Sequence, residues 1–359
     1  MDKRLPRLLH NLKVSDSLID AALDSGYFIR DWIDPFTGQT YATVSDRMYG
    51  NKQLSSSFEI EKFVRHLRGE KVFEPLPPFV EVTVHDQEGL LAVLGERQRQ
   101  RYVSDGSMSF RGQPKEYRLK RKVPNPRRSD RNGRELSILP GLYRQTGDEY
   151  SFARPVQERK PWRGFLNELE PNAKILSPAS PFAYDIMRTE QHYATQTPGL
   201  DVTFDIQTAL FFAMYQFRWK SDGTATYARV KPGDHQGVIY CFRFCDPSVK
   251  ETEFLIRDFD FFKTNRPERI LRQRCGLPLL GEHERNIAIT DIDCIIHLAP
   301  DFHYDAPLSR MYLFPGVFED EFYRLLLTVK DRCPEELNSV VEYEWARIGP
   351  GADAREREA

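Results

Sequence analysis

The sequence predicts an α+β protein. Amphipathic helical spacing dominates the first part of the chain. Runs rich in β-branched and aromatic residues at 224–230, 237–244 and 285–300 predict strands in the second half. Segregated helices and strands favour an α+β arrangement over a doubly wound one. The sequence has neither a G-x-G-x-x-G after a predicted strand nor a G-x-x-x-x-G-K-[ST], which disfavours a Rossmann or P-loop nucleotide site.

The N-terminal part of the chain is expected to be helical. The segment 15–26 places its apolar residues on one face, with an N-cap at Ser15 or Asp16 and a stop near Gly26. A second amphipathic helix is expected over 55–70. The prolines that follow each remove a backbone donor: Pro75, Pro77 and Pro78. We therefore expect an N-terminal helical region over 1–75, with a domain boundary after it.

The middle of the chain, 76–305, is expected to form one mixed domain. A helix over 84–102 would be capped by Asp86, and a strand over 106–112 would follow it. A strongly apolar helix is expected over 206–219, with Asp205 as its N-cap. The predicted strands of the second half belong to this domain.

The C-terminal segment, 306–359, is expected to be helical with a disordered tail. One helix is predicted over 320–332. A second is predicted over 334–348, because proline is favoured in the first turn of a helix. The last residues, 349–359, are small and charged, which is typical of disorder.

The composition limits the class of protein. The 359 residues are 40% hydrophobic and the formal net charge is -2, so the chain as a whole has no electrostatic reason to bind nucleic acid or an anionic membrane. No apolar run approaches the ~20 residues of a transmembrane helix. Five dispersed cysteines and an N-terminus without a secretion signal predict a cytoplasmic protein with reduced thiols. Cys241 and Cys245 have no further ligands nearby, so no metal is expected.

A single arginine at the end of the predicted strand 106–112 has two interpretations. Arg111 lies between Phe110 and Gly112 and could be a surface arginine that pairs with Glu116. Its guanidinium could instead bind a ligand, because Gly112 allows the backbone to approach closely. The motifs that follow along the chain favour the second interpretation.

These motifs resemble, in type and order, those of the FRG domain family, which is named for an (F/Y)-R-G motif. After "FRGQ" come "LSILPGLYRQ" and "EQHYATQTPGLDVTFDIQTALFFA". The matching positions are Phe110, Arg111, Gly112, Leu139, Pro140, Leu142, Arg144, Gln191, His192, Tyr193, Leu200, Asp201, Thr203, Ala209, Leu210, Phe212 and Ala213. The chain departs from the family pattern in lacking an arginine before the aspartate and in carrying Val202 in place of tryptophan.

A basic insertion, 115–134, separates two of these motifs. Two interpretations of its charge stay open. It could be a solvated, mobile loop, as charge runs with proline and glycine usually are. It could also be an arm that binds a polyanion, with each lysine or arginine neutralising a phosphate.

The same motif order resembles the catalytic core of ADP-ribosyltransferases, which implies a mixed-sheet core of that type with helical N- and C-terminal flanks. The resemblance implies NAD as substrate, with its pyrophosphate on Arg111, and no metal. Thr203 would position a catalytic carboxylate, which Glu284 in "EHERNIAI" would supply to stabilise an oxocarbenium-like ribose. The residues expected to contact NAD are Arg111, Gly112, Gln113, His192, Tyr193, Asp201 and Gln273.

Alternatives remain for the site and for the function. Gln273 competes with Glu284 for the third catalytic position, and a glutamine there would leave transfer chemistry without its carboxylate. His192 could be a core histidine, and Asp201 could pair with an arginine. The leading expectation is an ADP-ribosyltransferase that modifies a nucleic-acid or protein acceptor, as a toxin or phage-defence effector would. The alternatives are a non-catalytic module that binds a nucleotide or nucleic acid, and a structural scaffold.

Overall fold

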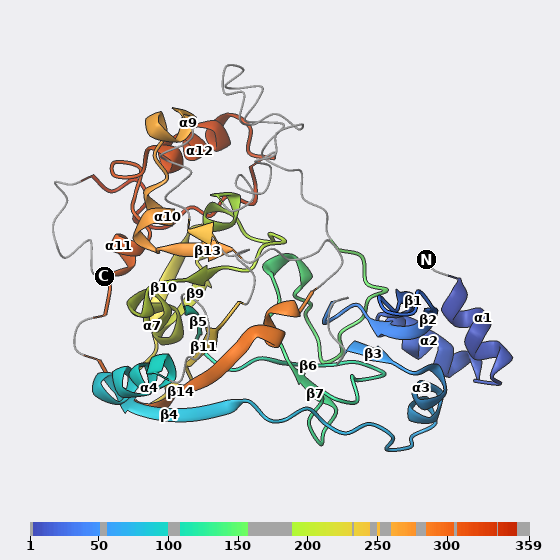
Figure 1. Cartoon of the computed structure of the whole chain (residues 1–359). Coiled ribbons are helices and arrows are strands. Elements are labelled where there is room, and N and C mark those ends of the chain that lie inside the picture. The colour runs from blue at the N-terminus through green and yellow to red at the C-terminus, as the bar shows by residue number, and fades with distance from the viewer. Residues whose placement is uncertain are drawn as a thin grey trace. The chain divides into compact units, whose positions relative to one another are not determined.

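The chain folds into two compact units, each of which contains helices and strands (Figure 1). The computed structural model describes residues 3–50, 56–99, 108–156, 189–231, 233–244, 250–251, 260–277, 285–304, 307–335 and 337–349. Unit 1 comprises Met1–Phe79, Glu116–Gln157 and Leu280–Asp291, and unit 2 comprises Val80–Lys115, Glu158–Leu279 and Ile292–Ala359. The predicted α+β class is confirmed, and the largest sheet is mixed.

Unit 1 combines short helices with a three-stranded antiparallel sheet of order β1-β2-β3. Its elements are α1 (Arg4–Asn11), α2 (Asp16–Asp24), β1 (Tyr27–Ile33), β2 (Thr40–Asp46), β3 (Ser57–Phe58), α3 (Ile60–Leu67), β6 (Arg118–Lys120), β7 (Arg134–Leu136), η2 (Gly141–Tyr143) and η4 (Ile287–Asp291). The helices near 15–26 and 55–70 are present. The sheet between them is not expected from a helical region over 1–75. At its base, alternate residues of β1 are buried, and so are the last three residues of β2.

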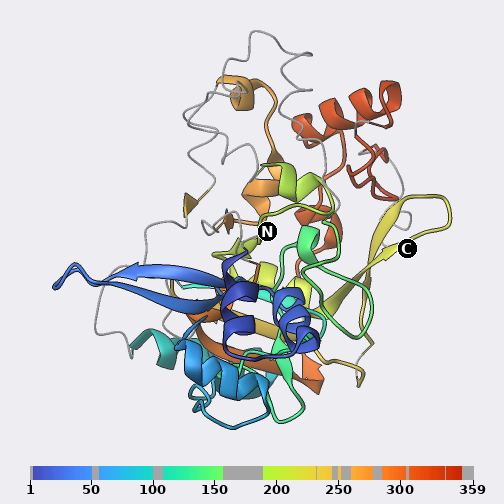
Figure 2. The same ribbon diagram turned by 90° about the vertical axis from the view of Figure 1, so that its right-hand side faces the viewer.

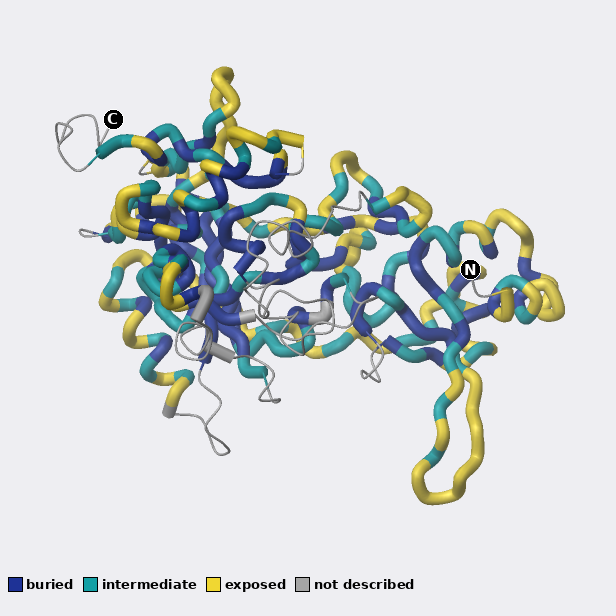
Figure 3. Tube along the Cα trace, turned by 90° about the horizontal axis from the view of Figure 1, so that it is seen from above, coloured by how far each residue is buried: buried dark blue, intermediate teal, exposed yellow. Residues whose placement is uncertain are grey.

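The β1–β2 hairpin extends beyond the helices of unit 1 as a two-stranded ribbon (Figure 2). The outer half of the hairpin is exposed (Figure 3), whereas the inner residues Tyr27, Ile29 and Val44 pack in the core of the unit. Val123, from the basic insertion, belongs to the same apolar cluster. The insertion is therefore part of the packing of unit 1.

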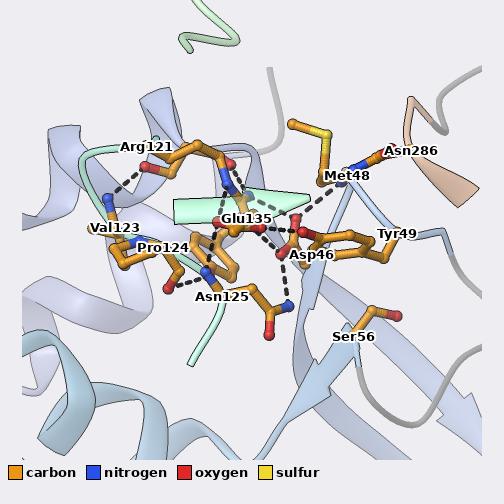
Figure 4. A network of polar contacts seen from close by, with 12 residues as sticks. Asp46, Met48, Tyr49, Ser56, Arg121, Val123, Pro124, Asn125, Glu135 and Asn286 are labelled. Atoms are coloured by element: carbon orange, nitrogen blue, oxygen red, sulfur yellow. Dashed lines mark hydrogen bonds and ion pairs between the residues drawn. The ribbon is translucent and has the colours of Figure 1, made fainter. Parts of the chain in front are cut away.

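The basic insertion contains a fully buried arginine, which contradicts the interpretation of the whole insertion as a solvated, mobile loop. The Arg121 guanidinium donates to both carboxylate oxygens of Asp46, at 2.9 and 2.8 Å, and to both of Glu135, at 3.0 and 2.8 Å (Figure 4). All three side chains are 0% exposed. Asn125 donates to Asp46 and Tyr49 donates to Glu135, which satisfies further lone pairs of the two carboxylates.

Two further arginines of the insertion pack against aromatic rings. The Arg127 guanidinium lies 5.8 Å from the ring centre of Phe58 and 5.6 Å from that of Phe73. The Arg128 guanidinium lies 4.7 Å from the ring centre of Tyr49, and burial lowers the pKa of Arg128. Arg121, Arg127 and Arg128 of the insertion thus contribute to packing inside unit 1.

Unit 2 is built on a seven-stranded sheet of order β12-β13-β8-β5-β11-β14-β4. Its strands are β12 (Lys250–Glu251), β13 (Cys275–Leu277), β8 (Val202–Thr203), β5 (Ser109–Gln113), β11 (Val238–Phe242), β14 (Ile292–His303) and β4 (Val80–Asp86). All neighbours are antiparallel except β14 and β4, which are parallel. The predicted strands at 106–112, 237–244 and 285–300 correspond to β5, β11 and, after a short 3-10 helix, β14.

Two helices of unit 2 begin at the caps that the sequence predicts. In α4 (Gln87–Arg99), a carboxylate oxygen of Asp86 accepts from the Gly89 amide at 2.8 Å. In α7 (Ile206–Met214), Asp205 accepts from two amides of the first turn. Both helices contribute to one apolar cluster with Phe110, Cys241 and Ile296 of the sheet. Asp86 and Asp205 therefore fix where the helices that cover this face of the sheet begin.

The predicted helix over 206–219 is too long. The chain leaves the helix at Met214, and β9 (Tyr215–Trp219) pairs with β10 (Ala225–Arg229). The apolar residues of this segment suit either structure, and pairing with β10 decides in favour of the strand.

The predicted second C-terminal helix over 334–348 does not form in the described residues of that segment. Val341 donates its amide to the Tyr193 carbonyl, and Val340 and Tyr343 form isolated β-bridges to Ala194 and Ala225. The helices of this region are α9 (Asp260–Thr264), α10 (Glu268–Arg272), α11 (Arg310–Leu313) and α12 (Glu321–Arg332). Within the described ranges, no helix has the length and apolar character needed to span a membrane. A cytoplasmic location stays a prediction.

Candidate functional site in unit 2

Arg111 lies in the middle of β5, whose neighbours in the sheet are β8 and β11. Side chains of a strand alternate between the two faces of the sheet. Phe110 packs in the apolar cluster with α7, and a Cβ at Gly112 would lie 1.8 Å from the Ala209 carbonyl oxygen of that helix. Gly112 is therefore required by helix packing, and Arg111 points to the opposite face. The expected role of Gly112 in ligand approach stays a prediction.

The Arg111 guanidinium contacts the segment that leads into β8. Its Nη1 donates to the Asp201 carbonyl oxygen at 2.6 Å, across 90 positions of sequence. The expected pairing with Glu116 does not occur, because Glu116 binds Arg118 at 2.6 Å. The carboxylate of Asp201 lies close to His192 instead.

His192 joins Asp201 to Gln273. Its Nε2 lies 3.3 Å from the Asp201 carboxylate, and its Nδ1 lies 3.2 Å from the Gln273 amide oxygen. The Gln273 amide nitrogen donates to the Leu313 carbonyl at 2.9 Å, which leaves the amide oxygen to face the imidazole as an acceptor. The Nδ1 of His192 therefore donates to Gln273, whereas its Nε2 lies at ion-pair distance from the Asp201 carboxylate without forming a hydrogen bond to that oxygen.

The electrostatics of His192 agree with this geometry. Burial by itself would lower the pKa of His192, but the Asp201 charge, together with contacts to Cys275 and Gln273, outweighs burial and raises the pKa to about 9. The His192 side chain is 4% exposed, whereas that of Asp201 is 40% exposed. The carboxylate is thus held by a buried cation and still accessible from solvent.

Thr203 contacts the backbone of the same network. Its hydroxyl donates to the Gln273 carbonyl at 2.6 Å and accepts from the Asp205 amide at 3.0 Å. The sequence assigned this hydroxyl to the positioning of a catalytic carboxylate. In the structure it ties β8 to the end of α10.

A buried arginine that the sequence did not assign supports both His192 and Gln273. The Arg269 Nη1 donates to the His192 carbonyl at 2.7 Å, and the Gln273 amide donates to the Arg269 carbonyl at 3.1 Å. The Arg269 guanidinium is 4.4 Å from the ring centres of both Tyr193 and Tyr323. Two signals in the sequence point to Arg269: it forms an Arg-Ile pair with Ile270, and it lies four residues before Gln273, within about one helical turn.

Tyr193 is a core residue in the structure, and its expected contact with NAD stays a prediction. It is 0% exposed, and its hydroxyl donates to the buried carboxylate of Asp320 at 2.6 Å. The two consecutive side chains therefore lie in different surroundings: His192 in the polar network and Tyr193 in the apolar core. Glu282 and Glu284 lie outside the described residues.

Four predicted residues, Arg111, His192, Asp201 and Gln273, form a continuous chain of side-chain and backbone contacts, with Thr203 attached to it. The formal charges of Arg111, protonated His192 and Asp201 sum to +1, which suits an anionic ligand. No group of three or more potential metal ligands occurs among the residues that the structure describes. Comparisons with protein-family models, curated proteins and solved structures found no significant match to this chain.

Proposed function

We propose that unit 2 binds NAD at the Arg111–His192–Asp201 network and cleaves the bond between nicotinamide and ribose, transferring ADP-ribose to a macromolecule or to water. The observation that carries the proposal is the combination of two cations with one accessible carboxylate, contributed by three separate segments. Guanidinium and imidazolium groups suit a pyrophosphate. A carboxylate suits the positive charge that develops on the ribose when nicotinamide leaves.

The chemistry balances without a metal or a second cofactor. The C–N bond breaks and its electron pair leaves with neutral nicotinamide. An oxygen nucleophile of the acceptor, or water, then bonds to the ribose carbon and loses its proton to a carboxylate or to solvent. Asp201 is the candidate carboxylate within unit 2. Glu284, which the resemblance to ADP-ribosyltransferases implies, belongs to a segment of unit 1 and stays a prediction from the sequence. Modification of a nucleic-acid or protein acceptor would suit a toxin or a phage-defence effector.

One observation favours a second candidate function, a non-catalytic nucleotide-binding module. Gln273 lies inside the network, bound to His192 at 3.2 Å, at the position where a third catalytic residue was expected. Its neutral amide cannot stabilise a developing cation as a carboxylate does. A module that binds nucleic acid through the basic insertion has less support, because Arg121 of the insertion is bound inside unit 1.

Release of nicotinamide from NAD by the purified full-length chain tests the proposal. We expect the parent to release nicotinamide. The release rate should fall about 10²-fold or more in the variant that removes the stabilising carboxylate, either Asp201→Asn or Glu284→Gln. Asp331→Asn is a matched control, because Asp331 pairs with the exposed Arg347 in the C-terminal part of unit 2. No nicotinamide release by the parent, with NAD bound, would establish the binding-module function instead.

A further inference from the structure

Three polar side chains share one face of β5. Ser109, Arg111 and Gln113 alternate along the strand with Phe110 and Gly112, which face α7. The three polar residues therefore lie in a row on the opposite face of the sheet. We call Ser109, Arg111 and Gln113 the polar row.

The two ends of the polar row are buried, and among the described residues their side-chain oxygens have no hydrogen-bond partner. Ser109 is 1% exposed and Gln113 is 6% exposed. The Ser109 hydroxyl oxygen and the Gln113 amide oxygen form no hydrogen bond with the part of the chain that the structure describes. Buried polar groups in folded proteins are rarely left in this state, because they lose their bonds to water without compensation.

The neighbouring strand explains why these groups have no partner. Directly opposite Ser109 on β11 is Phe242, and directly opposite Gln113 is Val238. Both neighbours are fully buried and apolar, so they can neither donate to nor accept from the row. Arg111, between the two ends, contacts the site already described through the Asp201 carbonyl.

We infer that Ser109 and Gln113 are ligand-binding residues that hold the two riboses of an ADP-ribose unit on either side of a pyrophosphate bound at Arg111. Alternate residues of a strand are about 6.7 Å apart, so the row spans about 13 Å. A cation at the centre with hydroxyl-binding groups at both ends matches a sugar–diphosphate–sugar ligand. Ribose hydroxyls can donate to the Gln113 amide oxygen and can both donate to and accept from the Ser109 hydroxyl.

This inference rests on the proposed function for the identity of the ligand, but its test concerns binding and not turnover. The binding of ADP-ribose and of inorganic pyrophosphate to the full chain is measured by calorimetry for the parent, Ser109→Ala and Gln113→Leu. We expect ADP-ribose affinity to fall about tenfold in each variant, because one hydrogen bond to a ribose is lost. Pyrophosphate affinity should be unchanged, because pyrophosphate has no ribose to reach the ends of the row.

The thermal stability of the ligand-free protein gives a second readout that a structural role would not produce. Removing a buried polar group that has no protein partner should leave the melting temperature unchanged or raise it. Thr208→Val is the matched control: the Thr208 hydroxyl is buried on α7 and donates to Asp205 at 2.8 Å. This control should lower the melting temperature and leave ADP-ribose affinity at the parent value.

The outcomes separate the two proposals. Parent-like ADP-ribose affinity in both variants, or no ADP-ribose binding by the parent, overturns the inference. If Gln113→Leu does not fold, Ser109→Ala alone decides, since it removes one oxygen atom. A parent that binds ADP-ribose through the polar row but releases no nicotinamide from NAD contradicts the proposed catalysis and supports the inference.

Discussion

Arg121 in unit 1 and Arg111 in unit 2 are both arginines bound to acidic residues, yet their surroundings differ. Arg121 forms two bidentate pairs, with Asp46 and Glu135, and all three side chains are excluded from solvent. Arg111 donates to the backbone carbonyl of Asp201, whose carboxylate is 40% exposed. An arginine whose carboxylate partners are all excluded from solvent suits the core of a fold, whereas an arginine next to an accessible carboxylate suits a ligand.

The largest expected effect is the loss of unit 1 stability on Arg121→Met. Two buried carboxylates would remain without their cation, which should lower the free energy of unfolding of unit 1 by about 3–5 kcal/mol. Hydrogen exchange of the β1, β2 and β7 amides in increasing urea measures this. Arg118→Met is the control, because Arg118 is 35% exposed and pairs with Glu116 and Asp130. Equal protection in the two variants would show that the buried network contributes nothing to stability.

A second experiment tests whether Arg111 contributes to activity and Arg121 to stability. Arg111→Met should reduce nicotinamide release by about 10²-fold, because the charge that binds the pyrophosphate is lost. The free energy of unfolding should change by less than about 1 kcal/mol, because the Asp201 carboxylate keeps His192 as a cationic partner. Release rates and urea unfolding are measured on the same samples, with the exposed Arg218→Met as control. Unfolding as severe as that of Arg121→Met, with normal release per folded molecule, would make Arg111 structural.

The smallest expected effect is the pH dependence that His192 adds to unit 2. The pKa of His192 is raised in the folded protein to about 9, above its ordinary value of 6.5. Its stabilising contribution is therefore complete below pH 6.5 and is lost as the pH rises through 9. Between pH 7 and pH 9 the loss should be about 2 kcal/mol.

The contribution of His192 is obtained as the difference between the parent and His192→Gln in urea unfolding at each pH. Taking the difference cancels the titration of lysines, tyrosines and cysteines that both proteins share. A difference that is constant from pH 7 to pH 9.5 would mean that His192 is neutral throughout, and that the Asp201 carboxylate lacks a cationic partner.

Some parts of the site could be predicted from the sequence because they lie within short motifs. Arg111, His192, Asp201 and Gln273 were selected by residue type and order, and the structure brings them into one network. Arg269 was not assigned a role. Its function as a support depends on aromatic rings from α12 and from Tyr193, which are close only after folding.

The α+β class, the caps at Asp86 and Asp205 and the order of the site residues could be predicted, because they depend on local hydrogen bonding and periodicity. The strand that begins at Tyr215, the core position of Tyr193 and the burial of Arg121 depend on contacts between distant segments. Arg121 meets Asp46 across 75 positions of sequence, and no local pattern reports such a pairing. Burial is a property of the assembled chain, and it changes a basic residue from a binding group into part of the core.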